Sequence, residues 1–222
     1  MKFVHPEIGK VFDTECGRVH SLIIENQAFF RRLLTELYEQ TNGYDGQCIV
    51  SINDAPVACA RYAEIIGSFV PFEMNRKPLL TKIASALEKR AASSEYWEKT
   101  GGILMELTAY LEELAFDFPC DIRFDKLGIN GIIKAASPEL RDDYTSMGEK
   151  IIDYMELVRT FDRDKLFFMV NLRAYIDDAE MNRLIETILA HGYHVLLLES
   201  SERPRLEREE RWIIDADLCE ID

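Results

Sequence analysis

The pattern of apolar and polar positions changes twice along the chain. Continuous apolar runs rich in β-branched or aromatic residues lie near both ends, and such runs are typical of strands buried on both faces. We therefore expect buried strands at 19–24 (VHSLII), 166–171 (LFFMVN) and 194–199 (HVLLLE). Between the ends, apolar residues recur at steps of three and four, which is the period of amphipathic helices.

The N-terminal third predicts a mixture of elements. Asn26 can cap the helix that follows the first buried strand. The apolar stripe of this helix is Phe29, Leu33, Leu34 and Leu37. The segment 48–60 (CIVSINDAPVACA) predicts two strands joined by a turn at 53–56. A third strand is expected at 63–70.

The middle of the chain predicts helices. Pro78 suits the first turn of a helix that ends near residue 92. Gly101 and Gly102 indicate a joint before a second long helix. That helix carries Leu104, Leu107, Leu111 and Leu114. After a break at 116–125 (FDFPCDIRFD), shorter helices are expected at 126–136 and 146–161.

The last third predicts strand, helix and strand in succession. Asp177 or Asp178 can cap the helix, and Gly192 suits its C-terminal end. The two flanking strands should be parallel with a right-handed crossover, and 212–215 (WIID) is expected to be an edge strand. We infer an α/β head domain from residues 1–72 and 162–222, with an α-helical leg domain inserted at 73–161.

Composition narrows the class of protein. The formal net charge is −14, yet the segment 72–92 holds five bases and two acids, which permits a basic surface on an acidic protein. No apolar run approaches the length of a membrane span, and the N-terminus lacks the pattern of a signal peptide. The five cysteines are dispersed and form no CxxC pair. We therefore expect a reduced, cytoplasmic protein.

Nucleotide chemistry is not indicated by the motifs. Neither GxxxxGK[ST] nor GxGxxG occurs in the chain. The turn that could hold a phosphate, 171–178, contains Asp177 and Asp178, whose carboxylates would repel an anion but favour a helix N-terminus. We expect no bound nucleotide and no catalytic residues.

Two sets of residues have both a structural and a functional interpretation. Asp117, Asp121 and Asp125 recur every four residues in the break between helices, where they could bind calcium or simply cap helices and face solvent. Lys82, Ser85 and Lys89 share one helical face, which is either a solvated surface or a contact for DNA phosphates. Arg31 and Arg32 on the first helix have the same two interpretations.

The order of these parts resembles the Csn-two family of CRISPR-associated proteins. The resemblance rests on the strand ending at Asn171, the helix after it, the strand LLLE and the stretch IIDAD at 213–217. PFEMNRKPLLTKIASALEKR is similar to the family's entry into its helical leg, and DIRFDKLGINGIIKAA to its later break and helix. The resemblance covers essentially the whole chain, in the family's short form.

The resemblance implies a head whose sheet is like that of a P-loop ATPase without Walker A. It also implies a homotetrameric ring that binds calcium and the ends of double-stranded DNA, without being an enzyme, during spacer acquisition. The implied partners are the integrase pair and the effector nuclease of the same system. The implied calcium ligands are Asp117, Asp121 and Asp125; Pro119 and Arg123 stand where relatives tend to carry acids. The expected DNA contacts are Arg31, Arg32, Arg76, Lys77, Lys82 and Lys89.

Two other functions stay open at this point. One is a nucleotide hydrolase with a non-standard phosphate site near 171–178. The other is a scaffold whose helical leg binds the other proteins of adaptation. ATP turnover would favour the first, and absence of DNA binding would favour the second.

Overall fold

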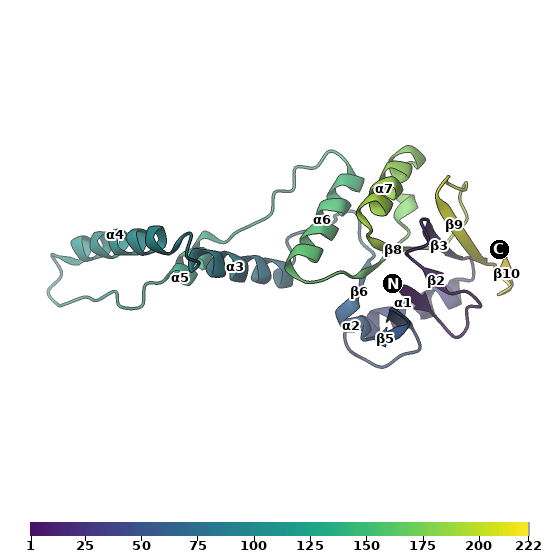
Figure 1. The fold of residues 1–222 in the computed structure, drawn as a ribbon, viewed down its shortest axis with the longest axis horizontal. Coiled ribbons are helices and arrows are strands. Elements are labelled where there is room, and N and C mark those ends of the chain that lie inside the picture. The colour runs from purple at the N-terminus through teal and green to yellow at the C-terminus, as the bar shows by residue number, and fades with distance from the viewer. Residues whose placement is uncertain (222) are drawn as a thin grey trace. The chain divides into compact units, whose positions relative to one another are not determined.

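The chain folds into two compact units. The computed structural model describes residues 1–221. Met1–Glu73 and the chain from Asp143 onward form the first, which we call the head unit, and Met74–Asp142 form the second, the helical unit. Figure 1 labels the elements of both, and each unit is described by itself.

The head unit is built on a six-stranded sheet with the strand order β10-β9-β3-β8-β7-β6. All neighbouring strands are parallel except β9 and β10, which are antiparallel. The strands are β3 (Val19–Ile24), β6 (Ala63–Ile66), β7 (Leu166–Val170), β8 (His194–Glu199), β9 (Glu209–Ile214) and β10 (Glu220–Ile221). The predicted mixed α/β class with a mainly parallel sheet is therefore confirmed.

A second, antiparallel sheet has the order β2-β1-β4-β5. Its strands are β1 (Lys2–Val4), β2 (Phe12–Asp13), β4 (Ile49–Ile52) and β5 (Ala55–Val57). The turn between β4 and β5 places Asn53 and Asp54 at φ 51° and 61°, as a two-residue hairpin requires. The predicted hairpin is confirmed, but Cys59–Tyr62 form a short helix, α2, instead of continuing the strand. The expected strand at 63–70 is also shorter, since β6 ends at Ile66.

Helices cover both faces of the large sheet (Figure 1). Every residue of β3 and β7 is buried, which accounts for their largely apolar sequences. The polar exceptions in β3 are His20 and Ser21. On one face, α1 (Gln27–Thr41) packs through Phe29, Leu33 and Leu37 against the sheet core. On the other face lie α6 (Met147–Phe161) and α7 (Asp178–His191), which contact each other.

The helix ends of the head unit follow the predicted capping. Asn26 Oδ1 accepts a hydrogen bond from Phe29 N at 3.0 Å, and Asp177 Oδ1 accepts one from Glu180 N at 2.8 Å. Gly192 ends α7 at φ 66°, a conformation that glycine adopts without steric cost. These three predictions are confirmed.

The assignment of α6 to the leg domain is wrong. Residues 143–161 belong to the head unit, where the apolar stripe of α6 is buried and the helix packs on α7. That stripe consists of Ile151, Tyr154, Met155 and Val158. An amphipathic helix needs an apolar surface to pack on, and periodicity does not identify which one.

The helical unit contains α3 (Lys77–Ala91), α4 (Trp97–Ala115) and α5 (Ile129–Ala136). Gly101 and Gly102 lie inside α4 and do not form a joint. The expected helix at 126–136 begins only at Ile129, and 116–125 form no strand. No residue of α4 or α5 is buried. Within residues 1–221, none of the helices combines the length and apolar character needed to span a membrane.

β9 is not an edge strand. It runs parallel to β3 along its whole length, and the short β10 lies outside it. The strand begins at Glu209, three residues before the predicted start. Both its polar first residues and its apolar later residues pair with β3.

Candidate functional site

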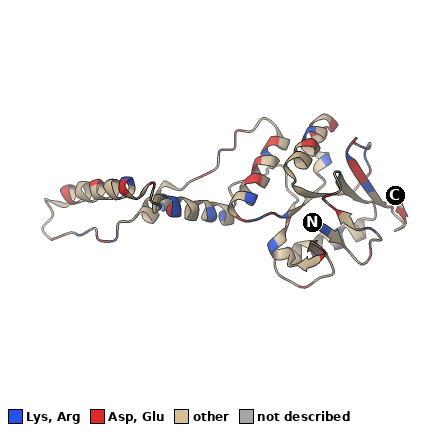
Figure 2. Ribbon diagram, viewed as in Figure 1, with Lys and Arg blue, Asp and Glu red and all other residues tan. Residues whose placement is uncertain are grey.

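α3 is the most basic helix of the helical unit. Four of its residues are basic (Lys77, Lys82, Lys89 and Arg90), and Glu88 is its one acid. Figure 2 shows Lys and Arg along α3, and Asp and Glu along α4. α3 and α4 therefore differ in charge, and α3 has the sign that attracts phosphate.

The predicted basic face of α3 is present. Lys82, Ser85 and Lys89 are spaced by three and four residues and so lie along one side of the helix. Ser85 and Lys89 are exposed, and Lys82 is half-buried. Lys82 and Lys89 are two helical turns apart, or roughly 10 Å along the axis. Both are therefore positioned to contact one elongated polyanion.

Arg76 and Lys77 belong to the start of α3 and not to this face. Arg76 is the N-cap residue and is half-buried, whereas Lys77 is exposed. Lys77 lies roughly 140° from Lys82 around the helix axis, since an α-helix has 3.6 residues per turn. The four predicted bases near α3 thus cover more than one side of the helix.

Arg31 and Arg32 lie on α1, in the head unit. Both are exposed. The Arg32 guanidinium pairs with the Glu7 carboxylate and lies 5.1 Å from the centre of the Phe29 ring. Because these arginines and α3 belong to different units, the structure does not define one surface from all six predicted bases.

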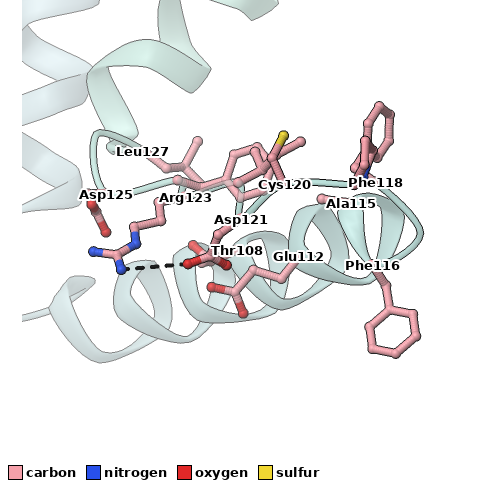
Figure 3. A pocket seen from close by; sticks show the side chains of 13 residues that line it. Thr108, Glu112, Ala115, Phe116, Phe118, Cys120, Asp121, Arg123, Asp125 and Leu127 are labelled. Atoms are coloured by element: carbon pink, nitrogen blue, oxygen red, sulfur yellow. Dashed lines mark ion pairs between the residues drawn. The ribbon is translucent and has the colours of Figure 1, made fainter.

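The acidic break after α4 borders a hollow of about 980 Å³ in the helical unit. Asp121 and Asp125 line it, but Asp117 does not. Two oxygen-bearing residues of α4, Thr108 and Glu112, also line the hollow. In Figure 3 the carboxylates of Glu112 and Asp121 both lie on the side of the hollow that the Arg123 guanidinium reaches.

Sequence spacing did not identify Glu112 as a candidate ligand. It lies within α4, before the break, and its place in the acidic series becomes visible only when the chain turns back after Phe118. A signal for it existed in principle. Residues near the C-terminal end of a helix lie beside the loop that follows it. Glu112 could therefore have been added to the candidate calcium ligands from its position in the helix pattern.

The structure does not bring the three predicted aspartates together as a metal site. In the described part of the chain, Asp117, Asp121 and Asp125 do not belong to any group of three ligand atoms within 4.8 Å of one another. Asp121 instead lies 3.6 Å from Arg123, at the position where relatives were expected to carry an acid. Calcium takes six to eight oxygen ligands. The oxygens lining the hollow have the right chemistry, and the calcium site stays a prediction.

The turn at 171–178 is filled by its own side chains. Arg173 is buried, and its Nη2 donates to Asp178 Oδ1 at 2.9 Å and to the Pro204 carbonyl at 2.8 Å. Its Nη1 lies 3.5 Å from Glu209 Oε1. The one buried cation of this turn is therefore paired within the protein.

A buried acid lies beside the same turn. Glu199 Oε1 accepts a hydrogen bond from Arg173 N at 3.2 Å. Burial raises the pKa of Glu199 to about 7. The acids Glu199, Glu209 and Asp178 around this turn disfavour a bound phosphate.

Comparison with known proteins agrees with this architecture. The family described as CRISPR-associated protein (Cas_Csn2) matches residues 40–218. The curated CRISPR-associated protein Csn2 of Enterococcus faecalis is 22% identical over 191 residues, covering 83% of this chain and 84% of that protein. The crystal structure of Stu0660 of Streptococcus thermophilus is similar in fold, with a TM-score of 0.55 and 13% identity. That similarity covers 95% of this chain and 74% of the other. The chain therefore belongs to the Cas_Csn2 family of CRISPR-associated proteins.

Proposed function

We propose that this protein binds the ends of double-stranded DNA during CRISPR spacer acquisition, as a homotetrameric ring and without being an enzyme. Family membership supports the role in spacer acquisition. The observation that carries DNA binding is the basic face of α3, where Lys82 and Lys89 lie on one side of a helix whose single acid is Glu88.

The chemistry of this face fits the DNA backbone and not the bases. Lysines act on phosphates as point charges and carry no sequence information. The formal net charge of −14 repels DNA from the rest of the surface. A localised basic region on an acidic protein favours DNA binding at that region over binding along the whole protein surface. This fits a ring that accepts DNA from an end.

The fold supports a binding function over nucleotide hydrolysis. We take the head sheet to be a P-loop-ATPase-like sheet whose phosphate turn has been replaced. In the turn at 171–178, Arg173 is engaged by Asp178 and Glu209, and Asp177 caps α7. A phosphate would have to displace these ion pairs and approach several carboxylates.

We further propose calcium as the cofactor, bound at the hollow after α4. Asp121, Asp125 and Glu112 would supply carboxylates, and loop carbonyls would complete the shell. Asp117 lies outside the lining of this hollow and would contribute only if the loop closes. The proposed protein partners are a second copy of this chain, the integrase pair and the effector nuclease.

The deciding experiment compares linear with closed circular duplex DNA in a gel-shift assay, with the oligomeric state measured by sedimentation with and without calcium. We expect a tetramer that binds only the linear form. Lys82→Glu with Lys89→Glu should abolish binding, while Lys99→Glu on the acidic α4 serves as the matched charge-reversal control. A monomer that ignores linear DNA in calcium would refute the proposal, and in that case the scaffold function would be favoured.

A further inference from the structure

A cysteine, a histidine and a glutamate meet at the start of β3, away from the sites described above. Cys16, His20 and Glu210 each offer one ligand atom, and these atoms lie within 4.8 Å of one another. Cys16 is exposed, His20 is buried, and the Glu210 side chain is 31% exposed. The proposed DNA and calcium functions use none of these residues.

The strand pairing and the loop before β3 hold the three ligand residues close together. His20 and Glu210 are direct neighbours in the parallel pairing of β3 with β9. Cys16 comes from the loop between β2 and β3, in which Gly17 adopts φ 77°, a conformation that favours glycine. The loop thereby turns back over β3, and the Cys16 Sγ lies 3.3 Å from His20 Nε2.

These separations suit a tetrahedral zinc ion. Zn–S and Zn–N bonds of the usual lengths place the two ligand atoms about 3.6 Å apart, close to the 3.3 Å between Cys16 Sγ and His20 Nε2. The Glu210 carboxylate, on a flexible side chain, offers an oxygen within 4.8 Å of the other ligand atoms. Thiolate and imidazole select zinc over calcium, which prefers oxygen ligands.

The surroundings allow the ligands to be released for a metal. Glu210 Oε1 pairs with Lys10 Nζ at 2.7 Å, which leaves Oε2 for coordination. His20 Nε2 now lies 2.9 Å from the Asp13 carbonyl oxygen. When Nε2 binds a metal, this contact opens and the ring proton moves to Nδ1. The exposed Cys16 side chain gives an ion an approach from solvent.

A second cluster, His5, Glu36 and Cys48, is less suited to a metal. Both His5 and Cys48 are buried, so an ion has no open approach. Burial, followed by the nearby Glu36 carboxylate, raises the pKa of the Cys48 thiol strongly, which opposes the thiolate that a metal needs. His5 is also already engaged, since its Nδ1 accepts from Glu7 N at 3.3 Å and its Nε2 faces Glu36.

We propose that Cys16, His20 and Glu210 form a zinc site that ties the loop between β2 and β3 to β9. Binding releases the thiol proton, because the thiolate is the ligand. The bound ion joins the loop before β3 and β3 itself to β9, which is distant in sequence. It stabilises the folded state by an amount that grows with the logarithm of the free zinc concentration.

The test uses cobalt, which occupies zinc sites and gives a thiolate-to-metal charge-transfer absorption band only when sulfur is a ligand. The purified, metal-free full-length chain is titrated with Co²⁺ under reducing conditions. We expect the band to appear with one equivalent of cobalt and to vanish when zinc is added. Zinc should also raise the midpoint of thermal unfolding, whereas calcium should neither produce the band nor displace cobalt from the site.

Variants identify the ligands. Cys16→Ser should remove the band, and Glu210→Gln should weaken cobalt binding roughly tenfold or more. Cys219→Ser, an exposed cysteine outside the cluster, should leave both unchanged. Circular dichroism confirms that each variant is folded. Absence of the band in the unmodified chain, or its persistence in Cys16→Ser, would overturn the proposal. A band lost in Cys48→Ser instead would assign the metal to the buried cluster.

Discussion

Arg173 and Glu209 form an ion pair of 3.5 Å inside the head unit, where both side chains are almost fully withdrawn from solvent. Glu209 also accepts hydrogen bonds from Ser21 Oγ at 2.5 Å and Leu206 N at 2.9 Å. The pair thereby links the turn after β7 to β3 and to the start of β9. Where a nucleotide-binding protein would bind phosphate, this protein has an internal structural network.

Breaking this pair should destabilise the protein strongly. Arg173→Leu leaves the buried Glu209 carboxylate without its cation, and losing one partner of a buried pair costs about 3–5 kcal/mol. Urea-induced unfolding followed by circular dichroism measures the change. The exposed Arg205→Leu is the matched control and should change the unfolding free energy by about 0.5 kcal/mol or less. An equally small change in Arg173→Leu would show that the pair contributes little.

The contribution of Glu199 to stability should fall as the pH rises from about 4.5 to about 7. Burial raises the pKa of Glu199 to about 7, above its usual value near 4.5. In this interval the unfolded chain has released the proton that the folded chain retains, so deprotonation favours unfolding. The loss is on the order of 3 kcal/mol for a shift of this size.

Glu199→Gln isolates this effect. The amide oxygen can still accept the hydrogen bond from Arg173 N, but the group no longer titrates. The difference in unfolding free energy between the variant and the unmodified chain should therefore grow in the variant's favour from pH 5 to pH 8. A difference that does not vary with pH would show that Glu199 titrates normally.

The salt dependence of DNA binding should report the lysines of α3. Each phosphate contact contributes about 0.9 to the slope of log K against log salt concentration. Lys82→Ala with Lys89→Ala should lower the magnitude of that slope by about 2, measured by fluorescence anisotropy on a linear duplex. Lys99→Ala on α4 should leave the slope unchanged. An unchanged slope in the double variant would place the DNA contacts elsewhere.

Removing Arg123 should strengthen calcium binding. Its guanidinium lies 3.6 Å from Asp121 and competes with a cation for that carboxylate. Arg123→Gln should tighten calcium binding a few-fold, because an exposed ion pair contributes only about 0.2–1 kcal/mol. Isothermal titration calorimetry measures the affinity. Asp121→Asn should weaken it, and Asp117→Asn, outside the lining of the hollow, serves as the comparison. Equal losses in both would indicate that the loop closes around the ion.

Local information in the sequence predicted where the candidate residues lie on the fold, while their roles in binding stay predictions. The face formed by Lys82, Ser85 and Lys89 follows from helix periodicity alone, and α3 forms as expected. Asp121 and Asp125 were found from their spacing, but Glu112 was missed and Asp117 lies outside the hollow. The loop's path, which sequence spacing does not encode, decides which acids share a space.

Local chemistry in the chain determined the buried strands β3, β7 and β8 and the ends of their helices. A strand covered on both faces favours apolar residues at consecutive positions, and Asn26, Asp177 and Gly192 act through bonds to residues within a few positions. These interactions need no distant partner, so they are visible in the amino-acid order.

Only the tertiary structure decided which distant segments meet. It placed α6 in the head unit, put β9 inside the sheet, and set Glu210 beside His20 and Cys16. An apolar stripe or a strand edge can pair with several surfaces of similar character. The choice among them depends on the packing of the whole unit, because each contact gains its free energy from burying both partners together.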